Sequence, residues 1–229
     1  MRYLEWIKDS DLTRICTELA ENFHANASDE VNFKNKVDPF SALFDIALND
    51  MSYDDWMNNE RIRQRQKTLQ NMIGNFHQNV LGCISGWENK AVGDVVDLVC
   101  PDKKIIAEVK NKYNTIKGSE KINLFNNFAH ALKYGYHGYT AYYVTVIAKK
   151  PLNVPFAPSD NSKKAKPEAN ENIREIDGAS FYAIATGSET ALADLYSVLP
   201  NILAKITDTD AERIKGNPLF SELFARAIK

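Results

Sequence analysis

The chain has 229 residues, of which 44% are hydrophobic and 25% charged, and its formal net charge is −2. This composition is typical of a folded domain with a sizeable core, and no apolar run approaches the roughly 18 residues that span a bilayer. The acidic balance argues against a protein that coats nucleic acid regardless of sequence. The start of the chain has no signal-peptide pattern, and the three cysteines lack metal-site spacing. We therefore expect a cytoplasmic protein with reduced cysteines and no membrane segment.

Charge is distributed unevenly along the sequence. The first 60 residues hold thirteen Asp and Glu against five Lys and Arg, whereas residues 61–67 hold four basic residues and no acid. Residues 102–121 hold six lysines against three acids, and residues 149–174 hold six basic residues against three acids. Such basic segments are typical of a local surface for a polyanion, although each one alone is equally typical of a solvated face.

Helical patterns dominate the first third of the chain. We expect a helix over residues 9–24 and a short helix over 41–48, which the cap-and-proline pair Asp38-Pro39 precedes. Ser52 predicts the start of a longer helix, and apolar residues recur at helical spacing through residues 68–82. The N-terminal third is therefore predicted to be helical.

Strands and helices alternate in the rest of the chain. The expected elements are a hairpin over 92–111, a helix over 119–134, a strand over 139–148, a long loop over 149–172, a second hairpin around Asp177-Gly178, and helices near 188–199 and 218–228. Long loops inside compact proteins are usually functional or mobile. This order predicts an α/β fold in which helices flank a central mixed sheet.

The first hairpin carries the most informative polar residues. If Cys100 pairs with Ile105 across the turn, Asp97 lies opposite Glu108, and alternation places Glu108 and Lys110 on one face. Two carboxylates and an ammonium among apolar residues are costly unless a divalent cation binds them. Mg²⁺ held by two carboxylates suits phosphodiester hydrolysis, with the lysine beside the attacking water or the phosphate. The spacing alone is more often that of a surface hairpin.

This motif resembles that of the PD-(D/E)xK nuclease superfamily, whose fold is a restriction-endonuclease-like αβββαβ core. Further blocks, spread from about residue 1 to 205, resemble the type II restriction endonucleases that cut GGNCC-like sites. These blocks are Val37–Phe44, Gln66–Asn71, Phe76–Asn79, Ala107–Thr115, Gly138–Val144, Ser159–Asn161 and Glu171–Arg174. The resemblance implies a Mg²⁺-dependent endonuclease that cuts double-stranded DNA as a homodimer. It also implies a restriction-modification system, in which a cognate DNA methyltransferase protects the same site.

The resemblance assigns roles to the hairpin residues by position. Asp97 and Glu108 match the metal-binding carboxylates, and Lys110 matches the catalytic lysine. Val96 stands where the motif has proline, a departure common in the superfamily. Asp94 is the alternative to Asp97, although the hairpin register places it on the opposite face. Asp97 is therefore the preferred ligand.

Other polar residues are candidates for accessory and DNA-binding roles. His77 and Gln78, on the helix before the hairpin, are accessory candidates, although a helix-surface or capping role suits His77 better. Side chains of the Asn, Lys and Arg types bind phosphates and base edges. The candidates of these types are Asn111, Lys112, Asn114 and Lys117 beyond the hairpin, and Asn161, Lys163, Lys164, Asn172 and Arg174 in and after the long loop.

The resemblance implies one nuclease domain over residues 1–229. Its parts would be a helical N-terminal region (1–85), a catalytic sheet core (86–187) and C-terminal helices (188–229). Two other functions stay open: a structure-directed or repair nuclease of the same superfamily, and a non-catalytic DNA-binding module. The intact Asp/Glu/Lys trio argues against the second alternative, because a retired site has no reason to keep buried charges.

Overall fold

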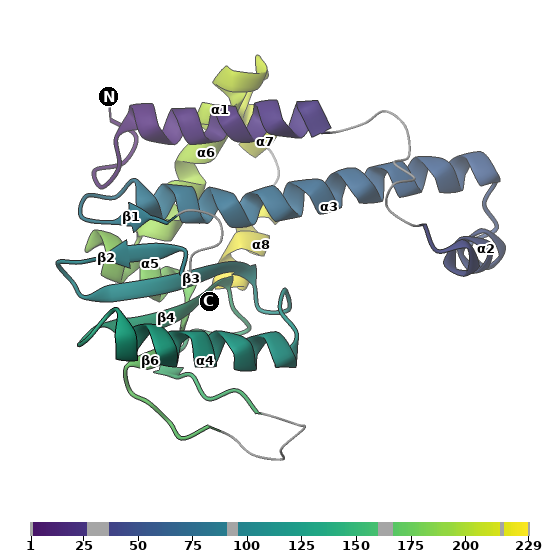
Figure 1. Ribbon diagram of the computed structural model, residues 1–229. Coiled ribbons are helices and arrows are strands. Elements are labelled where there is room, and N and C mark those ends of the chain that lie inside the picture. Colours follow the sequence, from purple (N-terminus) through teal and green to yellow (C-terminus); the bar gives the residue numbers. More distant parts are fainter. Residues whose placement is uncertain (1, 27–36, 91–95, 160–166, 216–217, 229) are drawn as a thin grey trace.

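The computed structural model describes residues 2–26, 37–90, 96–159, 167–215 and 218–228 (Figure 1). Its centre is a sheet with the strand order β1-β2-β3-β4-β6-β5. The strands are β1 (Glu88–Asn89), β2 (Leu98–Cys100), β3 (Ile105–Lys112), β4 (Thr140–Ile147), β5 (Asn153–Pro155) and β6 (Ile173–Asp177). The pairs β3–β4 and β4–β6 are parallel and the other pairs antiparallel. The predicted α/β fold with a mixed sheet flanked by helices is confirmed.

Three helices precede the sheet, as the sequence predicts. They are α1 (Asp9–Asn26), α2 (Pro39–Leu48) and α3 (Tyr53–Gly82). Asp38 caps α2 by accepting a hydrogen bond from the Phe40 N–H at 3.0 Å. Ser52 opens α3 with a capping box, which satisfies otherwise unpaired N–H groups of the first turn.

Only one end of α3 packs on the sheet. Phe76, Val80 and Leu81 near its C-terminus are buried in the core, whereas its N-terminal half extends away from the body and carries α2 at its end (Figure 1). We call α2 and this half of α3, residues 38–67, the arm. A helix of 30 residues is about 45 Å long, so the arm reaches well beyond the sheet.

The two faces of the sheet are covered by different helices. Ala107 and Val109 of β3 pack in a core with α1, α3, α5 (Gly178–Thr186) and α6 (Ala191–Thr207). Ile106 instead packs in a second core, with Phe128 of α4 (Gly118–Tyr134) and Tyr143 of β4. Since side chains alternate along a strand, Glu108 and Lys110 lie on the α4 face.

The predicted first hairpin is confirmed in position and register. Cys100 pairs with Ile105, and Leu98 pairs with Ala107. Continued by one residue, this antiparallel register sets Asp97 opposite Glu108, and the Asp97 N–H donates to the Ala107 carbonyl at 2.9 Å.

The predicted second hairpin is wrong. β6 ends at Asp177, and the residues after it form α5, because the Asp177 side chain caps that helix through the Ser180 N–H at 3.0 Å. Gly178 belongs to this junction for a steric reason: a Cβ there would lie 2.5 Å from the Val146 carbonyl oxygen. An Asp-Gly pair that suits a hairpin turn thus serves a helix cap and a close backbone contact instead.

The long loop and the C-terminus contain more structure than expected. β5 interrupts the predicted loop and pairs antiparallel with β6. The chain ends in α6, the short α7 (Ala211–Lys215) and α8 (Pro218–Ile228), the last as predicted. None of the helices in the described part of the chain is long and apolar enough to cross a bilayer.

Candidate active site

The hairpin brings Asp97, Glu108 and Lys110 together, as the sequence predicts. The Asp97 Oδ2 accepts a hydrogen bond from the Val109 N–H at 2.8 Å, which fixes this carboxylate against β3. The Lys110 Nζ donates to the Glu108 Oε1 at 2.6 Å. The side chains of Glu108 and Lys110 are 19% and 32% exposed, so solvent reaches both of them.

The electrostatics of the trio show a shortage of positive charge. Burial, and then the negative charge of Asp97, raise the pKa of Glu108. Burial also raises the pKa of Asp97. Burial acts to lower the pKa of Lys110, but the charges of Glu108 and Asp97 outweigh it and raise that pKa. One ammonium thus serves two carboxylates, and a cation beside them would remove the imbalance.

The donor set suits a hard divalent cation. Two carboxylates supply oxygen ligands and leave further coordination positions to water and a phosphate oxygen. Among the described residues, no group of three or more His, Cys, Asp and Glu side chains is placed to hold a metal ion. Asp97 and Glu108 therefore form a two-carboxylate site rather than a closed protein cage, which is an arrangement compatible with a substrate-facing metal.

Two hydroxyl groups on β4 extend the site. Tyr143 pairs with Glu108 and Thr145 with Lys110 in the parallel register. Both side chains are buried. Neither hydroxyl meets strict hydrogen-bond geometry with another group in the described part of the chain, although Thr145 acts against the burial that raises the pKa of Tyr143. Their place beside Glu108 and Lys110 makes them candidates to bind a molecule next to the trio.

An acid–base pair continues this row to β6. Glu175 of β6 lies opposite Tyr143 of β4 in the sheet. The Glu175 carboxylate lies 3.6 Å from the Nζ atom of Lys121 on α4. The same ammonium lies 5.3 Å from the centre of the Tyr143 ring. Sequence reasoning missed Tyr143, Thr145, Lys121 and Glu175. Period-two polarity along β4, with Tyr143 and Thr145 on one face, is the signal that could have found the first two.

The accessory candidates have other partners. The His77 Nδ1 lies 2.9 Å from the Tyr182 hydroxyl, and burial lowers the pKa of His77 to about 4. Gln78 donates to the Asn89 Oδ1 at 2.7 Å. His77 also lines an apolar cavity of about 260 Å³ between α3, β3, β4, α6 and α8. These contacts give both His77 and Gln78 a structural role. Asp94 lies outside the described residues.

The DNA-binding candidates beyond β3 divide into two kinds. Lys112, Asn114 and Lys117 are exposed where the chain leaves the sheet. Asn111 instead lines the apolar cavity beside His77, and its buried Oδ1 has no hydrogen-bond partner among the described residues. Of the loop candidates, Asn161, Lys163 and Lys164 lie outside the described residues.

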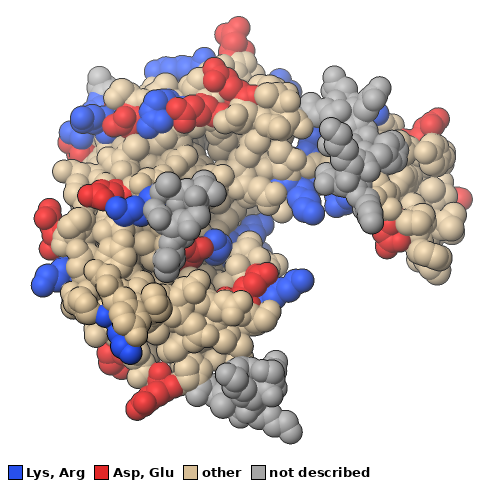
Figure 2. Space-filling view, in the orientation of Figure 1, with Lys and Arg blue, Asp and Glu red and all other residues tan. Residues whose placement is uncertain are grey.

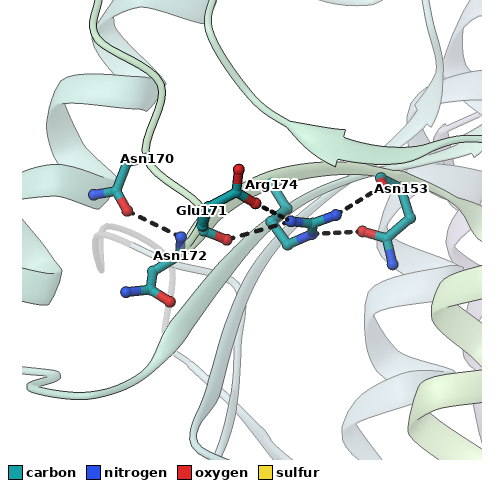
Figure 3. Close-up of polar contacts among 5 residues, drawn as sticks. All are labelled: Asn153, Asn170, Glu171, Asn172 and Arg174. Carbon is teal, nitrogen blue, oxygen red and sulfur yellow. Dashed lines mark hydrogen bonds and ion pairs between the residues drawn. The ribbon is translucent and has the colours of Figure 1, made fainter.

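Arg174 joins β6 to β5 and to the residue Glu171 just before β6 (Figure 3). Its Nε and Nη2 donate to the side chain and the carbonyl of Asn153, each at 2.7 Å, and its Nη1 donates to Glu171 at 3.0 Å. The Asn172 N–H donates to Asn170 at 2.9 Å. The Asn172 side chain is exposed and points away from this network (Figure 3). Arg174 is therefore engaged in contacts within the protein, and Asn172 is the DNA-binding candidate whose side chain faces solvent.

The molecule is hollowed between the arm and the body that carries the sheet. Figure 2 shows Lys and Arg side chains along the arm's side of this hollow. Within residues 38–67 the basic residues all fall in the run 61–67. A hollow with basic side chains along one side suits a polyanionic ligand.

Comparisons with known proteins place the chain among restriction enzymes. A family model described as Eco47II restriction endonuclease matches residues 4–208. The chain is 40% identical over 213 residues to the type II restriction enzyme Eco47II of Escherichia coli, a match that covers 90% of this chain and 89% of that enzyme. It is 33% identical over 238 residues to the type II restriction enzyme Sau96I of Staphylococcus aureus, covering 99% and 90%. Both similarities extend over nearly the whole chain.

Proposed function

Because this chain belongs to the Eco47II restriction endonuclease family and is a site-specific type II restriction endonuclease, we propose that it cuts a short palindromic GGNCC-like site in a Mg²⁺-dependent reaction. A palindromic target has two-fold symmetry, which a homodimer matches. The protein would act within a restriction-modification system, whose methyltransferase protects the same site. The convergence of Asp97, Glu108 and Lys110 on one face of the sheet carries the assignment of the active site.

Asp97 and Glu108 would hold the metal ion. Their oxygen atoms are the ligands that Mg²⁺ prefers, and burial raises the pKa of both carboxyls, so a bound cation would favour their charged forms. When bound, the ion supplies stabilisation of the charge on the phosphate and a lowered pKa for bound water. The Val109 N–H keeps the Asp97 carboxylate oriented, so that part of the site is organised before DNA binds.

Lys110 would act on the attacking water or on the scissile phosphate. Its ammonium is held by Glu108 at 2.6 Å and remains partly exposed, so it can donate a further hydrogen bond to either group. The Tyr143 and Thr145 hydroxyls on the neighbouring strand would hold the same water or phosphate oxygen. These donors are fixed by the sheet, and fixed donors lose little freedom when the substrate binds.

DNA would lie in the hollow between the arm and the body (Figure 2). Lys112, Asn114 and Lys117 are exposed next to the catalytic end of β3 and would contact phosphates, which position a duplex without reading its sequence. Asn172 would contact a base edge, since a side-chain amide can donate to guanine and accept from cytosine. Arg174 would support that contact indirectly, by holding the loop that carries Asn172.

The decisive experiment is digestion of plasmid DNA with Mg²⁺, followed by sequencing of the new ends. Ends at one palindromic site support the proposal, and a smear or uncut DNA contradicts it. Cuts at junctions or free ends would instead favour a structure-directed or repair nuclease. Plasmid methylated at GGNCC sites serves as the protected control.

The role of Lys110 has its own test. Lys110→Met should abolish cleavage while retaining binding of the specific duplex, because the ammonium acts on the reaction rather than on the DNA as a whole. Lys104→Met, at the exposed turn of the same hairpin, is the matched control and should cleave like the wild type.

A further inference from the structure

We propose that Lys121, in the first turns of α4, binds a DNA phosphate that flanks the one that is cut, and that Glu175 of β6 holds the lysine in place. The inference rests on the proposed function, because it needs DNA with its scissile phosphate at Asp97 and Glu108. Lys121 is then a contact to the substrate, and Glu175 is a positioning residue that acts through it. Neither residue belongs to the trio of the hairpin.

The sheet register places Lys121 beside the trio. Glu108 of β3 lies opposite Tyr143 of β4, which in turn lies opposite Glu175 of β6. The Lys121 Nζ lies 5.3 Å from the centre of the Tyr143 ring and 3.6 Å from the Glu175 carboxylate. Neighbouring strands are about 4.8 Å apart. The ammonium therefore lies one to two strand spacings from Glu108, on the face of the sheet that α4 covers (Figure 1).

The Lys121 ammonium has room for a further acceptor. Its distance from Glu175, 3.6 Å, exceeds the usual length of a charge-assisted hydrogen bond, about 2.7–2.9 Å. In the described part of the chain, the Nζ makes this ion pair and the contact with the Tyr143 ring but no hydrogen bond. The side chains of Lys121 and Glu175 are each 28% exposed, so a ligand can reach both. An ammonium has three donors, and here they are available to an anion.

A phosphate of the bound duplex is the anion that fits this place. Phosphates of one DNA strand follow one another about every 3.4 Å along the duplex axis. A scissile phosphate at the trio therefore brings its neighbours close to the start of α4, which follows β3 directly in the chain. Lys117 is exposed one helical turn before Lys121, on the same side of the helix. Two basic side chains thus lie in a row beside the metal-binding carboxylates.

Glu175 restricts the Lys121 side chain without neutralising it firmly. A free lysine side chain has many rotamers, and ordering it when DNA binds costs conformational entropy. The carboxylate keeps the ammonium over the Tyr143 ring, so part of that cost is met before DNA arrives. An ion pair between partly exposed groups contributes little to stability. A phosphate can therefore share or take over the ammonium.

The salt dependence of binding tests the phosphate contact. Fluorescence anisotropy of a labelled duplex in a chelator measures binding without cleavage. Lys121→Met should reduce the slope of log K against log salt concentration by about 0.9 for each chain that the duplex binds, because one phosphate contact is lost. Lys121→Arg should restore the slope, since a guanidinium also binds phosphate.

The matched control is Lys133→Met. The Lys133 Nζ also lies over a tyrosine ring, 5.0 Å from the centre of Tyr134, but in the last turn of α4. Twelve helical positions separate it from Lys121, or roughly 18 Å along the axis. Lys133→Met should keep the wild-type slope, so a loss common to both variants would overturn a specific contact at Lys121.

Neutral phosphates locate the contact on the DNA. A methylphosphonate, in which a methyl group replaces one charged oxygen, is placed in turn at the first and second phosphates on either side of the cleaved bond. At the phosphate that Lys121 binds, it should slow single-turnover cleavage by the wild type by about 10- to 100-fold. Lys121→Met should show no such additional loss there. A variant that loses as much as the wild type at every position overturns the contact.

Additivity tests the role of Glu175. Glu175→Ala should slow cleavage less than Lys121→Met does, and the double variant should be no slower than Lys121→Met alone, because Glu175 acts through the lysine. Losses that multiply overturn this positioning role. Thermal unfolding of each variant checks its fold, and if Lys121→Met unfolds at the assay temperature, Lys121→Gln replaces it under the same criteria.

The outcomes separate this inference from the proposed function. If the wild type binds DNA and Lys121→Met leaves the salt slope unchanged, the inference is overturned and the proposed function stands. A wild type that binds no duplex overturns both. A wild type that binds DNA with a slope that depends on Lys121, but leaves the plasmid uncut, contradicts the proposed cleavage and still supports the phosphate contact of Lys121.

Discussion

Asp97→Asn should make the metal-free protein more stable while it abolishes cleavage. Asparagine retains an oxygen that can accept the Val109 N–H, so the hairpin contact survives. It removes one of two buried carboxylates whose pKa values are raised in the folded protein. A site selected for metal binding thus carries a cost to folding, and a single substitution should reveal it.

The size of the effect follows from the sheet register. Residues opposite each other on antiparallel strands have Cβ atoms about 5 Å apart. Two like charges at that distance repel by about 3 kcal/mol at an effective dielectric constant near 20. Lys110 and partial protonation offset part of this repulsion, which leaves about 1–2 kcal/mol. For a chain of this size, that raises the unfolding temperature by about 2–8 °C.

The pH dependence of unfolding is a second test of whether Asp97→Asn stabilises the protein. A carboxylate whose pKa is raised on folding contributes stability below its unfolded pKa, about 4, and that stability is lost as pH rises through the folded pKa. The variant should therefore exceed the wild type at pH 7.5 in a chelator, and the difference should shrink toward pH 4. Added Mg²⁺ should stabilise the wild type but not the variant, since ligand binding favours the folded state.

Thermal unfolding and plasmid cleavage measure the two effects. Cleavage should fall by at least about 1,000-fold, or about 4 kcal/mol in the barrier. Asp102→Asn, at the exposed turn of the same hairpin, is the control and should change neither quantity. The reasoning is refuted if metal-free Asp97→Asn unfolds at or below the wild-type temperature, or if it cleaves within tenfold of the wild type.

Three other substitutions probe the rest of the structure. Tyr143→Phe removes a buried hydroxyl that meets strict hydrogen-bond geometry with no other group among the residues that the structure describes. The substitution should therefore leave the unfolding temperature nearly unchanged but lower the cleavage rate, and unchanged cleavage would contradict a role in the site. The lowered pKa of His77, about 4, means that stability falls as pH drops from about 6.5 to about 4, by up to roughly 3 kcal/mol. His77→Gln should flatten this denaturation profile, and a profile as steep as the wild type would assign the loss to other groups. Gly178→Ala places a Cβ 2.5 Å from the Val146 carbonyl oxygen, so calorimetry should show a loss of about 1–3 kcal/mol.

The sequence could predict the hairpin because its signals are local. A four-residue turn fixes the register, and the register alone sets Asp97 opposite Glu108 and Lys110 two positions further along the same face. The start of α2 was equally accessible, since Asp38 and Pro39 satisfy the first turn through short-range hydrogen bonds and fixed backbone angles. Each of these features depends on residues within one turn or one hairpin.

The errors arise where distant contacts decide the structure. Asp177-Gly178 is locally as suitable for a hairpin turn as for a helix cap, and the close approach of Val146 to Gly178, 32 positions apart in the chain, selects the cap. Tyr143 and Thr145 similarly acquire their meaning only when β4 aligns beside β3 in parallel. A parallel partner cannot be deduced from a turn, because the connection between the strands contains a whole helix.

Helical spacing alone also says little about where α2 lies. The spacing of its apolar residues is visible in the sequence, and in most helices such a stripe faces the core. Here the stripe lies away from both cores of the sheet, because α2 sits at the outer end of α3 (Figure 1). Phe40, Phe44 and Leu48 instead line a groove that Trp56 of α3 lines on its other side. Which helix a stripe faces is thus decided by the path of the chain after it, and local spacing does not contain that path.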